Sequence, residues 1–389
     1  MNKQMKKMYF YIFWASLFFE RTLWMIFLSN KGYSLIEIGL LQGILNVIMG
    51  IFEIPSGIIS DKIGRKKSII LGHIFIILYI LTFFAYEYYA IVLIGFVLYG
   101  IGVSLISGSD QSLVYEGISS DDKEGAYTKF IGKYNAIAII AIAISALLSG
   151  TMYKINELLI FSVTIAAQFI ALILIMTVKE IKSSQEKDEE NKFSDILKEI
   201  KIFVATRKEY KLLIMVIALM QGLVSILYQY GAIMLKDVGF GVQTISISIF
   251  ILSVVSALAS FKIEYLIGKI GKYRIIFLTL LISEILYLAM SIHVALTILA
   301  IFMITNILFE IWDTSLNIEL HETATNKIRT SLLSICNALT GLLMAAFSII
   351  IGVLNKVVEL NMVFMILASS VTIISIFLYL KYLKTIKKV

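Results

Sequence analysis

The chain has 389 residues, of which 59% are apolar and only 16% are charged, and its mean hydropathy is +0.90. Because globular proteins carry about 25% charged residues, this composition excludes a soluble globular protein and indicates a polytopic membrane protein. The net charge of +7 does not indicate a nucleic-acid partner, since the cations are concentrated in the loops between apolar runs.

Twelve apolar runs are long enough to cross a bilayer, since a transmembrane helix needs about 20 predominantly apolar residues. In chain order they lie near 8–29, 35–59, 68–86, 90–113, 130–151, 157–178, 211–233, 244–267, 274–292, 295–318, 331–353 and 358–380. Most connections are short, so neighbouring helices are expected to run antiparallel. We interpret the first run as a membrane span and not as a cleaved signal, because it carries Glu20 and Arg21 and lacks a small-residue cleavage site.

The distribution of cations predicts the orientation in the membrane. Placing both termini in the cytoplasm puts 29 of the 34 Lys and Arg residues on the inner side. The positive-inside rule requires this asymmetry. We therefore expect a multi-pass protein of the cell membrane with both termini in the cytoplasm.

One long polar segment, residues 179–210, divides the twelve runs into six and six. It predicts an N-terminal six-helix bundle over 1–178, a cytoplasmic linker, and a C-terminal six-helix bundle over 211–389. Within the linker, apolar residues from Phe193 to Val204 recur at helical spacing, which favours an amphipathic helix on the inner leaflet. For 181–192, a solvated linker is an equally good interpretation.

The two halves contain matching short segments in the same order. Asp61–Lys66 matches Gly268–Tyr273 at an offset of 207, Asp110–Glu116 matches Asp313–Glu319 at 203, and Asn135-Ala136 matches Asn337-Ala338 at 202. The offsets drift by about one helical turn, as small loop insertions produce. Three ordered matches at equivalent helix ends indicate two parallel six-span repeats.

The loop between the second and third runs carries the most specific motif. Residues 57–67 place one carboxylate, two glycines and four cations between two apolar runs. The segment resembles the loop 2–3 signature of the major facilitator superfamily, G-x-x-x-D-[RK]-x-G-[RK]-[RK]. The matching residues are Gly57, Asp61, Lys62, Gly64, Arg65 and Lys66. The resemblance implies an all-α fold of twelve transmembrane helices, arranged as two pseudo-symmetric six-helix bundles that work by alternating access.

The resemblance also implies a cytoplasmic gate around these loops. Asp61 and Arg65 are its expected latch in the N-terminal half. In the C-terminal copy Gly268 replaces the acid, so a weaker latch is expected there. Four acids near the cytoplasmic helix ends are assigned to the same gate: Asp110, Glu116, Asp313 and Glu319.

Charged residues inside the first run are functional candidates, because a charge at the bilayer centre costs about 2.5–3.5 kcal/mol on insertion scales. Glu20 lies about 18 Å into the span, close to the midplane of a ~30 Å core. We expect Glu20 to face the central cavity as a proton or cation site. Arg21 is expected to tune it or to bind an anionic group. A structural ion pair between packed helices is the alternative.

Further polar residues of the spans complete the expected cavity. Asn306, Glu310, Asp313 and Asn317 share one face of the tenth span, and Glu310 is a second candidate coupling residue. Neutral substrate contacts, or interhelical hydrogen bonds as the alternative, are assigned to Gln42, Asn46, Asn135, Gln221 and Tyr228.

No enzyme motif is present. The chain has no Gly-x4-Gly-Lys-[Ser/Thr] loop, no H-E-x-x-H and no Gly-x-Ser-x-Gly, so we expect no catalytic residue, no cofactor and no metal. We expect a monomeric secondary active transporter that exports a lipophilic drug or small organic compound with proton coupling. The alternative is ion-coupled uptake or exchange of a small polar metabolite such as a sugar or an organic anion. Arg21 in the cavity favours anions, whereas Glu20 and Glu310 in the cavity favour cations.

Overall fold

A computed structural model describes residues 3–107, 109–110, 112–113, 123–180, 208–292, 294–323 and 326–386, and within these ranges the ordered elements are helices. The chain forms two compact units, Met1–Ser184 with Gly241–Ser253 and Gln185–Phe240 with Val254–Val389. The expected amphipathic helix near 193–204 and the gate candidate Glu116 lie outside the described residues.

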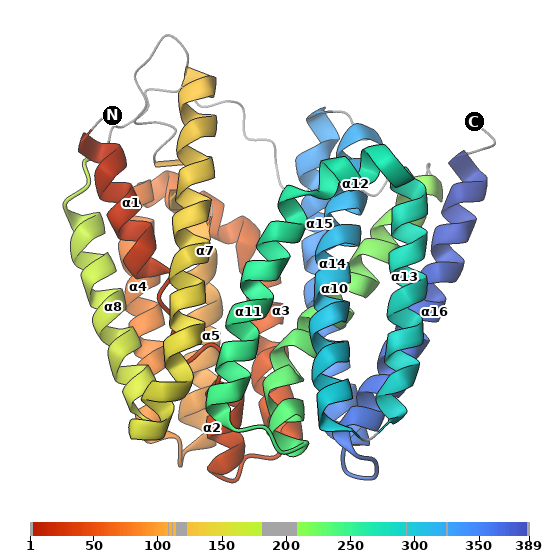
Figure 1. Cartoon of the computed structure of the whole chain (residues 1–389). Coiled ribbons are helices and arrows are strands. Elements are labelled where there is room, and N and C mark those ends of the chain that lie inside the picture. Colours follow the sequence, from red (N-terminus) through yellow and green to blue (C-terminus); the bar gives the residue numbers. More distant parts are fainter. Residues whose placement is uncertain are drawn as a thin grey trace. The chain divides into compact units, whose positions relative to one another are not determined.

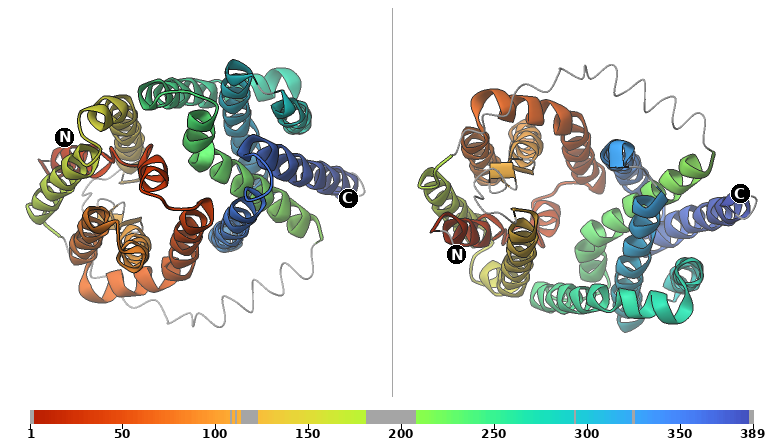
Figure 2. Two further views of the ribbon diagram at one scale, coloured as in Figure 1. Left: turned by 90° about the horizontal axis from the view of Figure 1, so that it is seen from below. Right: turned by 90° about the horizontal axis from the view of Figure 1, so that it is seen from above.

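Unit 1 consists of helices with roughly aligned axes, which Figure 2 shows end-on. They are α1 (Lys3–Ala15), α2 (Trp24–Asn30), α3 (Leu35–Ile63), α4 (Arg65–Thr82), α5 (Tyr89–Ser107), α7 (Lys123–Ile155) and α8 (Leu159–Met176), with the first half of α11 (Val242–Phe261) (Figure 1). A short 3₁₀ turn follows α4 at Phe83–Ala85, and another, in unit 2, follows α13 (Lys272–Leu288) at Ala289–Ser291.

Unit 2 contains the rest of α11 and six further helices. They are α10 (Lys208–Asp237), α12 (Ile263–Ile270), α13 (Lys272–Leu288), α14 (Ala295–Thr323), α15 (Asn326–Leu354) and α16 (Leu360–Ile386). Within this unit α10 packs against α14, α15 and α16, and α13 packs against α14 and α16.

Eleven of the described helices are long and apolar enough to cross a membrane, and they correspond to the second to twelfth expected runs. The first run differs from the expectation of one continuous span. It is divided into α1 and α2 by a non-helical segment, residues 16–23 (Figure 1). The polar Glu20-Arg21 pair lies in this segment, which we call the span-1 break.

The second span contains Pro55, the single proline of the sequence. The helix α3 runs without interruption from Leu35 to Ile63 through the proline. A proline removes one backbone hydrogen bond, and a helix in a membrane protein tolerates this where its surroundings compensate. The helix begins with a capping box, in which the Ser34 backbone N–H donates to the Glu37 carboxylate at 2.8 Å.

The backbone supports the expected repeat. The described residues with positive φ are four glycines, which form two pairs separated by 207 residues: Gly32 with Gly239, and Gly64 with Gly271. The second pair has almost the same conformation, φ 99° and ψ 146° at Gly64 and φ 90° and ψ 135° at Gly271. Each of these two glycines joins the helix of an even-numbered span to the next, so the same turn is built at the same place in both halves.

Alanine substitutions at these glycines test whether the two turns require a residue with positive φ. Gly271→Ala is expected to lower the melting temperature of the purified protein, because a side chain in this backbone region costs about 1–3 kcal/mol. Gly64→Ala is expected to lower it by a similar amount, because its backbone has the same positive φ and the nearest atom to its Cβ, Oε1 of Glu180 at 2.9 Å, belongs to the end of a flexible side chain that can move away. Gly268→Ala is the control, because that residue is helical and its Cβ would meet nothing within 4 Å. Equal melting temperatures in all three variants would contradict the argument.

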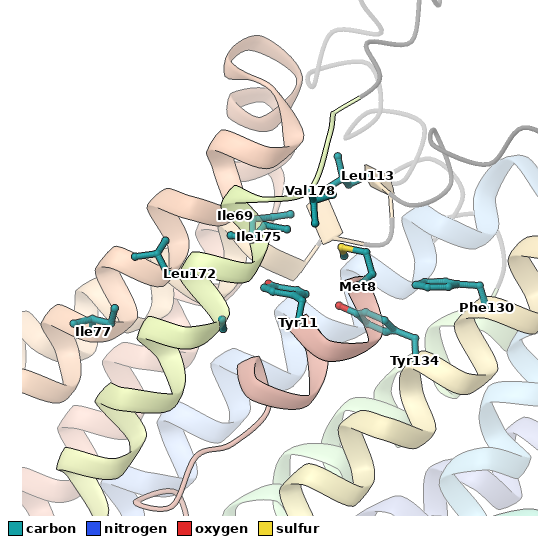
Figure 3. Close-up of a cluster of buried hydrophobic side chains, with 11 residues drawn as sticks. Met8, Tyr11, Ile69, Ile77, Leu113, Phe130, Tyr134, Leu172, Ile175 and Val178 are labelled. Atoms are coloured by element: carbon teal, nitrogen blue, oxygen red, sulfur yellow. The ribbon is translucent and has the colours of Figure 1, made fainter. Parts of the chain in front are cut away.

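The end of unit 1 at which α1 begins is filled by a compact apolar cluster contributed mainly by α1, α4, α7 and α8 (Figure 3). Its buried members are Met8, Tyr11, Ile69, Ile77, Leu113, Phe130, Tyr134, Ala171, Leu172, Ile175 and Val178. The cluster packs α1 against α8 and so anchors α1. The span-1 break begins at the next residue after α1 in the chain.

Candidate functional site

The span-1 break turns its two charged side chains into different surroundings. Glu20 is 2% exposed and accepts a hydrogen bond of 2.7 Å from the hydroxyl of Thr164 on α8. Arg21 is exposed. The described residues contain no ion pair between these neighbours. The two neighbouring side chains therefore have different surroundings, one buried against α8 and one exposed.

Aromatic side chains of α4 and α5 line the break. Tyr99 stacks on Tyr79 with ring centroids 4.3 Å apart, and Phe18 of the break lies against Tyr99 at 6.1 Å. The hydroxyls of Tyr79 and Tyr99 lie within electrostatic reach of both Glu20 and Arg21. The two charged residues of the break thus lie beside tyrosine side chains, which combine aromatic rings with polar hydroxyls.

The neutral candidates of unit 1 are divided between the interior and the surface. Gln42 and Asn46 are buried on one face of α3, and Gln42 Nε2 donates to Asn46 Oδ1 at 3.1 Å. In the described structure Asn46 Nδ2 is buried without a hydrogen-bond partner. Asn135 is exposed on α7. Among these three residues, Asn46 therefore has an unused donor.

Unit 2 contains a polar network around Asp313. Its carboxylate accepts hydrogen bonds from Gln221 of α10 at 2.7 Å and from Asn317 at 3.0 Å. Thr340 of α15 donates to Gln221 Oε1 at 3.3 Å, a contact that the sequence analysis did not anticipate. Asp313, which the sequence analysis assigned to the gate, is thus bonded to the cavity candidate Gln221.

The other unit 2 cavity candidates are placed around this network. Glu310 is half-buried one turn before Asp313. Asn306 is buried, and its amide donates to the Phe302 carbonyl of its own helix at 2.7 Å. Tyr228 is half-buried on α10 and stacks on Phe302 at 6.4 Å between ring centroids.

Across the junction of α3 and α4 at Gly64, the expected pair is formed. Arg65 Nη2 lies 2.7 Å from Asp61 Oδ1, and its Nη1 donates to the Ser60 hydroxyl at 3.2 Å. Asp61 is exposed, and exposed ion pairs contribute about 0–1 kcal/mol. Its role as a latch remains a prediction. Of the other motif residues, Gly57 lies inside α3 and Lys62 is exposed near its end.

Glu180 is a partner of this loop that the motif did not indicate. Its carboxylate accepts from the Lys66 backbone N–H at 3.3 Å, at the N-terminus of α4, where negative charge is favourable. The Lys66 ammonium donates to the Met176 carbonyl at the end of α8 at 2.7 Å. Asp110 lies deeper and accepts from the Tyr134 hydroxyl at 2.6 Å.

The corresponding loop of unit 2 forms a different ion pair. Lys272, which follows Gly271, lies 2.5 Å from a carboxylate oxygen of Glu319 on α14. Glu319 is 2% exposed, and it also accepts from the hydroxyls of Tyr382 and Tyr273. Although this half lacks the acid that corresponds to Asp61, it therefore connects the loop to a buried carboxylate.

Comparison with known proteins places this architecture in a family. The family model described as Major Facilitator Superfamily matches residues 9–321. The MFS-type transporter YxaM of Bacillus subtilis (strain 168) is 26% identical over 227 residues, which cover 57% of this chain and 56% of the relative. The match thus spans just over half the length of that relative.

Solved structures agree on the fold. The nucleoside transporter NupG superposes with a TM-score of 0.78 at 13% identity, over 99% of this chain and 100% of the other. A D-xylose-proton symporter superposes with a TM-score of 0.72 at 14% identity, over 96% of this chain and 95% of the other. At these identities the likeness concerns the fold alone.

Proposed function

We propose, from the premise that this chain belongs to the major facilitator superfamily of multi-pass membrane transporters, that it moves a small organic anion and couples this movement to protons. This favours the polar-metabolite alternative over drug export. Arg21 is the expected contact for the anion, and Glu20 is the expected proton carrier.

The exposure of Arg21 is the observation that supports an anionic substrate. Halfway along a membrane span, an exposed guanidinium is not stable against lipid and is expected to face a water-filled path. Arginine binds carboxylates and phosphates through two parallel hydrogen bonds. Glu20, by contrast, is buried against α8, where it does not offer a cation the open contact that a cationic substrate needs.

The burial of Glu20 supports proton coupling. A carboxyl that is removed from water is stable in its neutral form and needs a donor to be stable as an anion. The Thr164 hydroxyl is such a donor. A carboxyl that is stable in both its neutral and its ionised form can take up a proton from one side of the membrane and release it to the other.

Export of a lipophilic compound is the second candidate, and the aromatic side chains beside the break favour it. Phe18 and Tyr99 are half-buried and lie against each other at 6.1 Å, and Tyr99 stacks on the buried Tyr79. A flat apolar molecule could bury its surface there. For either substrate we propose a monomer in the cell membrane with both termini in the cytoplasm.

Transport by purified protein in liposomes tests the proposal. With a pH gradient imposed, the wild-type protein is expected to accumulate at least one member of a panel of radiolabelled carboxylates and phosphate esters. Arg21→Ala is expected to reduce this accumulation at least tenfold, and Arg21→Lys is expected to retain part of it. Lys133→Ala, which removes an exposed cation of α7, is the control and is expected to transport normally.

Two results would overturn the proposal. One is wild-type accumulation that Arg21→Ala leaves unchanged. The other is a wild-type protein that moves none of the anions but moves lipophilic dyes, a result that would establish the second candidate.

A further inference from the structure

The span-1 break is stabilised by two side chains of another helix. In a continuous helix the Phe19 N–H would donate to the Ala15 carbonyl, four residues earlier. Here the Phe19 N–H donates instead to Thr164 Oγ1 at 3.0 Å, and the Ala15 carbonyl accepts from Gln168 Nε2 at 3.3 Å. Both partners of one missing backbone bond are thus satisfied by residues one turn apart on α8.

The orientation of Gln168 is determined by a chain of buried hydrogen bonds. Because a carbonyl only accepts, the Gln168 amide nitrogen faces Ala15 and its oxygen faces His73 Nδ1 at 3.0 Å. Nδ1 of the neutral ring must therefore carry the proton, so Nε2 accepts from the Tyr11 hydroxyl at 2.9 Å. In this series of hydrogen bonds each group has a defined role as donor or acceptor, which favours a single conformation of the break.

The fold itself does not require the break. In the second half, the equivalent first span is α10, which is helical without interruption from Lys208 to Asp237. The described residues therefore show the break in one repeat only, at the place where Glu20 lies.

Thr164 can satisfy Glu20 in both of its protonation states. Its oxygen accepts from Phe19, and its one hydrogen can point either to Glu20 Oε2 at 2.7 Å or to the Ile160 carbonyl at 2.8 Å. When Glu20 is ionised, the hydroxyl donates to the carboxylate. When Glu20 is protonated, the carboxyl donates to Thr164, and the hydroxyl turns to Ile160. Proton exchange therefore leaves no buried polar group unpaired.

We propose that Thr164 and Gln168 are positioning residues. They stabilise the non-helical break in span 1, and they hold Glu20 where its carboxyl is hydrogen-bonded in both protonation states. The role assigned to Glu20 rests on the proposed function, whereas the support of the break does not. The other titratable or charged groups facing Glu20 are Arg21 on its own segment, Tyr79 on α4 and Tyr99 on α5.

Hydrogen–deuterium exchange of the purified protein tests the support of the break without any transport assay. Thr164→Val keeps the volume but removes the hydroxyl, so amides of peptides covering residues 14–24 are expected to exchange about tenfold faster, because the Phe19 N–H loses its partner. Thr164→Ser is expected to restore the wild-type rate. Ser162→Ala, which removes an exposed hydroxyl of the same helix, is the control.

The pH dependence of transport tests the second part. Thr164→Val is expected to move the pH midpoint of transport upward by about one unit, because the carboxylate loses a charge-assisted hydrogen bond, and Thr164→Ser is expected to restore it. An unchanged exchange rate in Thr164→Val overturns the proposal. If exchange rises but neither Thr164→Val nor Glu20→Gln alters the pH dependence, the positioning of the break stands and the coupling role of Glu20 fails.

Discussion

Glu20→Gln is expected to abolish uphill transport driven by a pH gradient while leaving exchange of substrate across the membrane active. Glutamine has nearly the shape of a protonated glutamate and can make the same hydrogen bond with Thr164, so the break is expected to persist. It cannot release a proton, and a carrier that never releases its proton cannot use the gradient. The measurement compares gradient-driven accumulation with counterflow of the same anion in liposomes, with at least a tenfold loss expected in the first only.

Glu310→Gln provides the internal comparison for this experiment. Glu310 is the second coupling candidate and is half-buried in unit 2. If Glu310→Gln loses gradient-driven accumulation and Glu20→Gln retains it, the coupling group lies in unit 2, and the assignment of Glu20 is wrong.

The second large effect concerns the stability of the Lys272–Glu319 pair. Lys272→Ala leaves the buried carboxylate of Glu319 without its cation, and breaking a buried pair in this way costs about 3–5 kcal/mol. We expect the melting temperature of the purified protein to fall by several degrees. A double variant, Lys272→Met with Glu319→Gln, is expected to recover much of this loss because no charge remains buried.

Arg65→Ala is the matched control, since Arg65 occupies the corresponding place in the first repeat. Its partner Asp61 is exposed, so the expected loss is below about 1 kcal/mol. Similar losses for Lys272→Ala and Arg65→Ala would show that burial does not distinguish the two loops, and the argument would then fail.

Several properties could be predicted from the sequence because they depend on local composition. A membrane span is specified by about 20 consecutive apolar residues, and eleven of the twelve expected spans correspond to single described spanning helices. The turn at Gly64 and its copy at Gly271 were indicated by glycine and charge at a fixed spacing, and both have the same positive-φ conformation. Membership of the superfamily followed from the same loop.

The site depends on contacts that the sequence does not encode locally. Glu20 and Arg21 are adjacent, and helical periodicity would separate them by only about 100° around one axis. Periodicity also gave no sign that the first span is broken, since residues 16–19 are predominantly apolar. The direction of each side chain therefore could not be predicted from the pattern.

The sequence by itself determined eleven of the spanning helices, the repeat and the turns at Gly64 and Gly271, since hydrophobicity and turn chemistry act over neighbouring residues. Only the tertiary structure decided that the helix of span 1 is interrupted, that Glu20 is buried and that Arg21 is exposed. The physical reason is that Thr164 and Gln168, far away in the chain, supply the two hydrogen bonds that replace the missing backbone bond between Phe19 and Ala15. A buried backbone group must be paired, and its partner here became known only when α8 was packed beside α1.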